Sequence, residues 1–274
     1  MKLMYITNDT AVATIAENAG VDRIFIDMEY IGKNLRQGGM DTVQNHHTIE
    51  DIKNIRRTLT KAELLVRINP VHDKTEIYSS TEEEIDEVIN AGADIIMLPY
   101  FKTVYEAERF LRAVSGRCKT ILLFETPEAI ENIDEIIALP LIDEVYIGLN
   151  DLSLGYGYKF MFMPLANGTV ENIANKFKAY GLNFGFGGIA AMNGGMLKGE
   201  KILAEHIRLG SSCVILSRSF CNLNNGADIS DLEKLFADGV KEIREYEKAY
   251  SSKPAEFFKK NKEEVKAIVE NICK

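Results

Sequence analysis

The sequence predicts a (β/α)₈ TIM barrel with an extra C-terminal helix, on three observations. Eight short apolar runs alternate with segments of helical periodicity, and turn residues separate them. Most of these runs are continuously apolar, which is typical of parallel strands buried on both faces. Eight strand–helix units within about 220 residues match one such barrel in number and length. An open, doubly wound parallel sheet is the alternative arrangement.

The first element is a strand, because residues 1–7 lack the pattern of a signal peptide and begin with an apolar run. The later strands follow at regular intervals along the chain. The predicted strands are Leu3–Ile6, Arg23–Ile26, Glu63–Ile68, Asp94–Leu98, Thr120–Phe124, Glu144–Ile147, Asn183–Phe186 and Ser212–Leu216.

Local signals mark where the intervening helices begin and end. Thr48 with Asp51 resembles a capping box, and Pro127 suits a first helical turn. Gly20 and Gly92 fit the left-handed position that ends a helix before the next strand. The predicted helices are Ala11–Asn18, Ile49–Thr58, Glu82–Asn90, Val104–Val114, Pro127–Ala138, Val170–Tyr180 and Gly199–Leu209.

The tail Ser252–Lys274 predicts a further amphipathic helix outside the barrel count. Its apolar residues recur at helical spacing: Phe257, Phe258, Val265, Ile268, Val269 and Ile272. We therefore expect one barrel domain over residues 1–250 and a helix over residues 251–274. This helix must bury its apolar stripe, either on a neighbouring subunit of a homo-oligomer, which we predict, or on its own barrel.

Composition and charge exclude several classes of function. The hydrophobic content of 46% and charged content of 27% are ordinary for a globular protein. The net charge of −9 disfavours nucleic acid or an anionic membrane as partner. No apolar run reaches the roughly 20 residues of a membrane span. The four cysteines lack metal-ligand spacing and are expected to be reduced thiols of a cytoplasmic protein.

Two carboxylates just beyond consecutive predicted strands are the main functional signal. Glu125 directly follows the fifth strand, and Asp151 lies shortly after the sixth. The ends of neighbouring parallel strands share one edge, so both carboxylates are expected at the same rim. Two hard oxygen ligands suit a divalent cation such as Mg²⁺, Mn²⁺ or Co²⁺.

Other strand ends also carry polar groups or glycine. The second ends at Asp27 and Glu29, the third at Arg67, the seventh at Gly185–Gly188, and the eighth at Ser217 and Arg218. The active site of a TIM barrel lies at this rim. Two long segments, 30–47 and 155–169, would lie above it as loops.

The pattern resembles the HpcH/HpaI aldolase family, which is related to the citrate lyase beta subunit within the phosphoenolpyruvate/pyruvate superfamily. The resemblance extends over about residues 1–220. Its most specific motifs are Phe25–Tyr30, Val66–Arg67, Gly92–Asp94 with Leu98–Pro99, Glu125–Ala129 with Asn132–Ile136, and Gly148–Ser153.

The resemblance implies roles for individual residues. Glu125 and Asp151 correspond to the metal ligands, and Arg67 to the arginine that stabilises an enolate oxygen. Asp27 and Glu29 would orient Arg67 or a metal-bound water. We expect the substrate near Gly148, Leu149 and Asn150, and further donors for a ligand at Gly187, Ser217 and Arg218.

The chain departs from the family pattern in two places. The aldolases have a histidine for proton transfer after the Asp-x-Glu of the second strand, where this chain has Tyr30. His46 or His47 can return a histidine to the rim, since an unperturbed pKa near ~6.5 suits acid–base work. The chain also lacks the long loop before the fifth strand, as on the citrate lyase side of the family.

The leading hypothesis is a metal-dependent carbon–carbon lyase that acts on a pyruvate-like 2-keto acid and an aldehyde. A citrate-lyase-like enzyme for acyl-CoA thioesters is one alternative. It would need a basic patch for the CoA phosphates, and the sequence shows no obvious one beyond Lys33, Arg36 and Arg218. A non-catalytic barrel that has lost its base is the other. Retention of Glu125 and Asp151 together with Arg67 argues against the second alternative.

Overall fold

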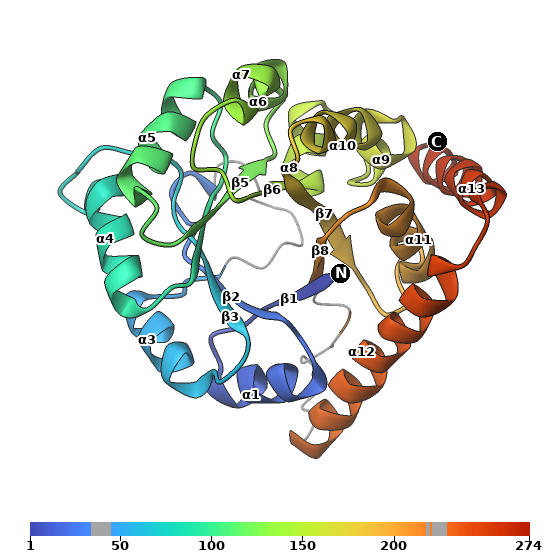
Figure 1. Cartoon of the computed structure of the whole chain (residues 1–274), viewed down its shortest axis with the longest axis horizontal. Coiled ribbons are helices and arrows are strands. Elements are labelled where there is room, and N and C mark those ends of the chain that lie inside the picture. The colour runs from blue at the N-terminus through green and yellow to red at the C-terminus, as the bar shows by residue number, and fades with distance from the viewer. Residues whose placement is uncertain (34–44, 218–219, 221–228) are drawn as a thin grey trace.

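The computed structural model describes residues 1–33, 45–217, 220 and 229–274. Its centre is a closed barrel of eight parallel strands in the order β1 to β8, with β8 pairing back onto β1. Figure 1 looks into this barrel and shows the helices as a ring around it. The predicted TIM barrel is therefore confirmed, and the open sheet is excluded.

Each strand pairs with the next one along the chain, in parallel. The strands are β1 (Lys2–Ile6), β2 (Arg23–Asp27), β3 (Glu63–Arg67), β4 (Ile95–Leu98), β5 (Lys119–Phe124), β6 (Glu144–Ile147), β7 (Asn183–Ile189) and β8 (Cys213–Leu216). They match the predicted runs to within a residue or two, except that β7 continues three residues further, through its glycines.

The helices follow the strands as expected, with additions after β6 and β8. They are α1 (Thr10–Ala19), α3 (Ile49–Thr58), α4 (Thr81–Ala91), α5 (Val104–Val114), α6 (Pro127–Glu131), α7 (Ile133–Ile137), α8 (Leu149–Gly155), α9 (Met163–Ala166), α10 (Thr169–Ala179), α11 (Gly199–Leu209), α12 (Ile229–Ser251) and α13 (Ala255–Cys273). The segment 155–169, expected to be a loop, thus contains the end of α8 and all of α9.

The residues predicted to begin and end helices do so in the structure. Thr48 and Asp51 form a reciprocal capping box, and Pro127 opens α6. Gly20 and Gly92 end their helices with φ of 99° and 107°. The single helix predicted over 127–138 was wrong: it breaks into α6 and α7 at Asn132, whose side chain donates to the Glu128 carbonyl.

Alternate residues of the strands form two separate cores. One set packs against the helices, and the other forms a cluster of its own inside the barrel: Met4, Phe25, Leu65, Ile95, Met97, Ile121, Leu123, Tyr146 and Cys213. Because side chains alternate along a strand, the inward series continues from Phe25 to Asp27, from Leu65 to Arg67, and from Leu123 to Glu125. The barrel packing thus directs the polar strand ends to its mouth.

Helix α13 packs on α9 and α11 of its own barrel, and these helices lie side by side in Figure 1. Val265 and Val269 are buried there. The buried Asn261 side chain donates to the Lys201 carbonyl at 3.1 Å and to Glu205 at 2.9 Å. Docking on its own barrel, the second of the two predicted options, therefore buries part of the apolar stripe, whereas Ile272 remains exposed.

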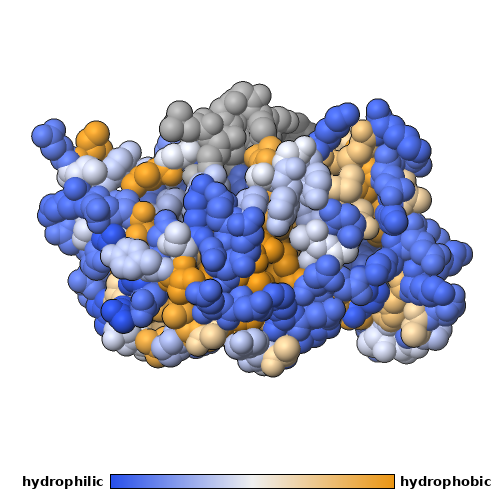
Figure 2. All heavy atoms as spheres, turned by 90° about the horizontal axis from the view of Figure 1, so that it is seen from above, coloured by the Kyte–Doolittle hydropathy of each residue, from blue (hydrophilic) through white to orange (hydrophobic). Residues whose placement is uncertain are grey.

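The face of the barrel seen in Figure 2 is predominantly hydrophilic. It is largely blue, with hydrophobic residues in orange showing between the hydrophilic ones. In the described ranges, the helices are all too short or too polar to span a bilayer.

Candidate active site

Glu125 and Asp151 lie just beyond two neighbouring strands of the barrel. Strands β5 and β6 pair in parallel, with Phe124 opposite Ile147. Glu125 follows β5 directly, and Asp151 lies in the first turn of α8 just beyond β6. Both are nearly inaccessible to solvent, at 3% and 6% exposure. The N-cap of α8 is Gly148, so Asp151 is not the N-cap of this helix.

The Glu125 carboxylate is held on both sides. Its Oε1 accepts a hydrogen bond from the Tyr100 amide at 3.0 Å. Tyr100 has a φ of 48°, a left-handed conformation that costs energy in a non-glycine residue and is frequent at functional sites. On the other side, a Cβ at Gly148 would lie 2.5 Å from Glu125 Oε2. Backbone strain at one neighbour and the absence of a side chain at the other therefore fix this carboxylate.

Arg67 points its guanidinium toward carboxylates of the mouth. Its Nε and Nη2 donate to the two oxygens of Asp27, each at 2.8 Å, and its Nη1 lies 3.3 Å from Glu29. Burial alone would lower the pKa of Arg67, but Asp27, Glu29 and Glu125 outweigh it and raise this pKa well above its usual value. The guanidinium is thus permanently charged, and the charge of the metal-ligand candidate Glu125 stabilises it together with its direct partners Asp27 and Glu29.

Lys33 completes this cluster and was not predicted as part of it. Its ammonium lies 3.0 Å from Asp27 and 3.3 Å from Glu29, and its side chain is only 5% exposed. Lys33 is therefore not available to a CoA phosphate, because two buried carboxylates already bind its ammonium. The i,i+4 spacing between Glu29 and Lys33 is the sequence signal that could have indicated this contact.

Asp27 is engaged on every side, which suits a positioning role rather than a proton-transfer role. Besides Arg67 and Lys33, it accepts from the Asn45 side chain at 3.1 Å and from the Glu29 amide at 3.2 Å. Burial would raise the pKa of Asp27, but Arg67, Lys33 and Asn45 outweigh it and hold this pKa below the usual range. A carboxyl group with so low a pKa stays ionised, and its negative charge holds Arg67 and Lys33 in place.

The two loop histidines differ in their surroundings. His47 is buried, and its Nδ1 accepts a hydrogen bond from the Asp27 amide at 3.0 Å. Burial lowers the pKa of His47 against the opposing effect of Asp27. The neutral ring then carries its proton on Nε2, and this geometry favours a structural role for His47. His46 is exposed, with its ring 6.3 Å from that of Tyr30.

A rim cavity of about 560 Å³ lies beside the ends of β2 and β3. Its lining includes Met28, Tyr30, His46, His47, Asn69, His72, Tyr78 and Glu84. The Tyr30 ring packs 5.9 Å from that of Tyr78, and burial together with Glu84 raises the pKa of Tyr30. Tyr30 therefore stays a neutral phenol and does not supply a phenolate base in place of the family histidine.

The remaining predicted binding residues surround β6 to β8. Leu149 is buried and Asn150 half-buried at the start of α8. Gly187 has a φ of 53°, and its carbonyl accepts from the Tyr146 hydroxyl at 2.7 Å. The Ser217 amide donates to the Ile189 carbonyl at 2.8 Å. Arg218, like Arg36, lies outside the described residues.

Packing explains part of the glycine cluster in β7. A Cβ at Gly185 would lie 2.4 Å from the Tyr146 ring and equally close to the Cys213 carbonyl. Glycine at 185 is therefore needed to admit the large Tyr146 side chain into the barrel interior. Gly187 likewise makes room for Leu149, whose side chain would lie 2.7 Å from an added Cβ.

The donor set at the mouth fits a hard divalent cation. Glu125 and Asp151 supply carboxylate oxygens, which Mg²⁺ prefers, and Mg²⁺ commonly takes only one or two carboxylates together with water and substrate. Among the described residues, no group of three or more His, Cys, Asp and Glu side chains is arranged to hold a metal. Such a cation would therefore need ligands from substrate or solvent in addition to the two acids.

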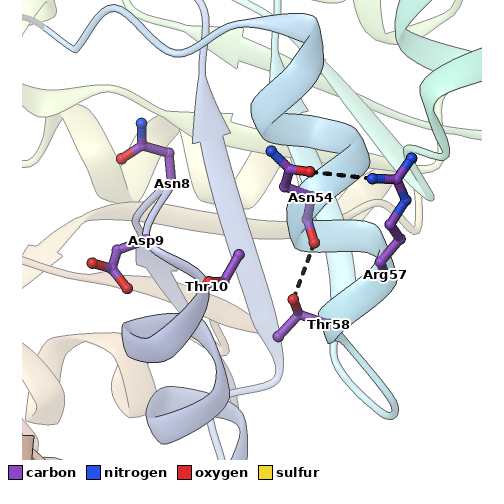
Figure 3. Close-up of a pocket in the computed structure, with 6 residues that line it drawn as sticks. All are labelled: Asn8, Asp9, Thr10, Asn54, Arg57 and Thr58. Atoms are coloured by element: carbon purple, nitrogen blue, oxygen red, sulfur yellow. Dashed lines mark hydrogen bonds between the residues drawn. The ribbon is translucent and has the colours of Figure 1, made fainter.

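A separate cavity of about 590 Å³ lies on the outside of the barrel, between the start of α1 and α3 (Figure 3). Asn8, Asp9 and Arg57 in its lining are all exposed. Asp9 already caps α1, and Arg57 donates to Asn54 on its own helix at 3.3 Å. Neither of the buried acids Glu125 and Asp151 lines this surface cavity. We therefore assign the chemistry to the barrel mouth.

Comparison with solved structures supports the fold. An HpcH/HpaI aldolase from Desulfitobacterium hafniense DCB-2 superposes with a TM-score of 0.60 at 17% identity, over 93% of this chain and 94% of that one. A family protein from Burkholderia cenocepacia J2315 gives 0.62 at 16% identity, over 89% and 94%. Citrate synthase SbnG gives 0.61 at 17% identity, over 85% and 93%.

Sequence comparison shows the family. No curated protein matches the chain in sequence. The family profile of the HpcH/HpaI aldolases and citrate lyases, in contrast, matches residues 2–162. That region is more than half of the chain, and it contains Asp27, Arg67, Glu125 and Asp151. The chain therefore belongs to the HpcH/HpaI aldolase/citrate lyase family.

Proposed function

We propose that this protein is a divalent-metal-dependent carbon–carbon lyase of the class II aldolase type. It would act through a pyruvate-like enolate and cleave or form a 2-keto-4-hydroxy acid, with an aldehyde as second reactant. One observation carries this proposal. Two buried carboxylates lie just beyond the paired strands β5 and β6, Glu125 directly after β5 and Asp151 in the first turn of α8, and the guanidinium of Arg67 lies at the end of β3.

The residues divide the chemical work as follows. Glu125 and Asp151 would hold Mg²⁺, Mn²⁺ or Co²⁺, which when bound acts as a Lewis acid toward a keto oxygen. Arg67 offers its guanidinium to the oxygen on which negative charge develops when a proton leaves the adjacent carbon. Asp27 and Glu29 orient Arg67 through the contacts described above. This arrangement requires no Schiff base.

The mechanism also needs a group that carries the proton to and from the carbon beside the keto group. Asp27 is held as a carboxylate by Arg67 and Lys33, and His47 already accepts a hydrogen bond through Nδ1. We therefore propose His46, at the rim cavity, as the histidine for proton transfer. Its replacement by alanine should slow proton exchange while leaving divalent-cation affinity unchanged.

The test is deuterium exchange of the pyruvate methyl protons, followed by NMR in D₂O. The protein with Mg²⁺ or Mn²⁺ should catalyse exchange, and EDTA or the Asp151→Asn change should abolish it. Asp134→Asn removes an equivalent charge from the exposed pair with Lys176 and should have no effect. Exchange that persists in EDTA, or in Asp151→Asn, would refute this mechanism.

The likeness to citrate synthase SbnG supports a second candidate, a reaction on an acyl-CoA thioester. The same enolate chemistry would then take place at the thioester methyl group. Exchange of acetyl-CoA protons without exchange of pyruvate protons would select this candidate. If neither substrate exchanges and Glu125→Gln does not alter metal binding, the barrel is a non-catalytic one.

A further inference from the structure

We propose that Lys33 is a positioning residue that sets the electrostatic balance of the barrel mouth, so that the mouth admits the anionic carboxylate of a 2-keto acid. This inference rests on the proposed function and extends it to a residue outside the family motifs. Lys33 acts here through Asp27 and Glu29, which lie between its ammonium and the guanidinium of Arg67.

Four charges form one closed cluster. Arg67 and Lys33 both contact the same oxygen of Asp27, at 2.8 Å and 3.0 Å. They also both lie 3.3 Å from the same oxygen of Glu29. The side chains of the two acids are 1% and 0% exposed. With so little solvent at the acids, their charges are screened mainly by these two cations.

The charge count shows what Lys33 adds. Asp27 and Glu29 bring two negative charges, and Arg67 brings one positive charge, so these three alone leave an excess negative charge beside the guanidinium. Lys33 cancels that excess among the described residues. Glu125 and Asp151 bring two further negative charges, which a divalent cation would cancel. Without Lys33, the loaded mouth would repel the carboxylate that the proposed reaction must bind.

Burial and pairing exclude two simpler roles for Lys33. A lysine that binds CoA phosphates needs an exposed ammonium, whereas this side chain is 5% exposed and contacts two carboxylates. A Schiff-base lysine must present its Nζ to a carbonyl carbon, whereas the Nζ of Lys33 already contacts two buried carboxylates. Its place in the cluster is instead that of a fixed positive charge.

The experiment measures two affinities whose changes must have opposite signs. Binding of Mn²⁺ is followed by electron paramagnetic resonance, and binding of pyruvate to the Mn²⁺-loaded protein by calorimetry. Lys33→Met should weaken pyruvate binding by roughly tenfold and tighten Mn²⁺ binding by a few-fold, because one positive charge is gone from a poorly screened site. Lys33→Arg should restore both values.

A merely structural role gives a different result. A loosened mouth would weaken pyruvate and Mn²⁺ binding together, and that outcome, or no change in either affinity, would overturn the proposal. Lys176→Met, which removes the same charge from an exposed pair with Asp134, is the matched control and should change neither affinity.

A second variant keeps the test decisive should Lys33→Met fail to fold. Glu29→Gln removes a negative charge from the same cluster, so it should tighten pyruvate binding and weaken Mn²⁺ binding. The reverse signs would refute the charge balance. Wild-type protein that binds no Mn²⁺ would overturn the proposed function itself, and this distinguishes that failure from the failure of the role of Lys33.

Discussion

Two uncharged neighbours determine where the Glu125 carboxylate lies. Tyr100 presents its amide to Oε1 only because its backbone adopts a left-handed conformation. Gly148 leaves space for Oε2 only because it has no side chain. The position of a metal-ligand candidate thus depends on two residues that would not bind the metal themselves.

Gly148→Ala tests this dependence. The added methyl group would lie 2.5 Å from Glu125 Oε2 and 2.7 Å from its Cβ, so the Glu125 side chain must move. We expect Mn²⁺ affinity to fall by about tenfold or more, the effect of displacing one oxygen ligand from its place. Electron paramagnetic resonance titration measures the affinity.

Gly157→Ala is the control for this change. Gly157 has a φ of 70°, so an alanine there strains the backbone. Unlike the Cβ added at Gly148, however, a Cβ added at Gly157 would have no atom within 4 Å. We expect a lower melting temperature, from about 1 kcal/mol of backbone strain, with unchanged Mn²⁺ affinity. Unchanged affinity in both variants would show that Gly148 has no part in positioning Glu125.

Among the individual site residues, those that directly continue a strand could be predicted from the sequence, whereas those contributed by loops could not. Asp27, Arg67 and Glu125 were identifiable because each continues the inward alternation of an apolar strand. Lys33 was not identified as part of the cluster, since its contacts depend on how the chain turns after β2. Tyr100 was not identified either, because a left-handed backbone at a non-glycine residue leaves no mark in the sequence.

The helices follow capping signals closely, with exceptions that have physical causes. The start of α3 was predicted from its capping box, whereas the break after α6 depends on Asn132 bonding to nearby carbonyls. Helix α12 was not predicted, although its buried residues recur at helical spacing: Leu232, Phe236, Val240 and Ile243. That repeat was the available signal.

Val269→Ala tests how α13 is attached. Val269 is fully buried between this helix and its own barrel, so the change should lower the free energy of unfolding by about 1–3 kcal/mol through lost burial and a cavity. Urea titration measures this loss, which should not vary with protein concentration. The exposed Lys266→Ala is the control on the same helix.

A dependence of the stability loss on protein concentration would show that α13 also takes part in a contact between subunits. If the stability loss grows as the protein is diluted, α13 stabilises a subunit contact as well as its own barrel, as in the oligomer predicted from its apolar stripe. If Val269→Ala costs nothing at any concentration, the docking of α13 on α11 contributes no stability.

For the whole molecule, one ion network joins strands across the end of the barrel opposite the active site. Arg23 on β2 donates to Glu63 on β3 at 2.9 Å and to Glu144 on β6 at 2.8 Å. Glu63 also contacts Lys2 on β1 and Lys119 on β5. Strand number and order were predictable from the alternation of elements, but this network was not, because it joins residues up to 121 positions apart.

The network predicts a defined acid sensitivity. Burial would raise the pKa of Glu63, but Lys119, Lys2 and Arg23 outweigh it and lower this pKa from 4.5 to about 2. A carboxylate with a depressed folded-state pKa stabilises the protein fully above the unfolded value and loses that contribution as the pH falls toward the folded value. The stabilisation should therefore disappear between about pH 4.5 and pH 2.

Glu63→Gln should flatten this part of the pH profile of unfolding. Urea titrations in that range should show a difference in pH dependence on the order of 1–3 kcal/mol between variant and wild type. Glu76→Gln, on an exposed loop, should keep the wild-type profile. Parallel profiles for wild type and Glu63→Gln would mean that the ion network does not contribute to acid stability.

The central claim, that Glu125 and Asp151 together bind one divalent cation at the barrel mouth, is tested most directly by a Mn²⁺ titration followed by electron paramagnetic resonance. Wild-type protein should bind one Mn²⁺ per chain, and pyruvate should perturb the bound signal. Glu125→Gln and Asp151→Asn should each abolish this binding. Mn²⁺ that binds equally well to both variants, or does not bind the wild type, would contradict the account.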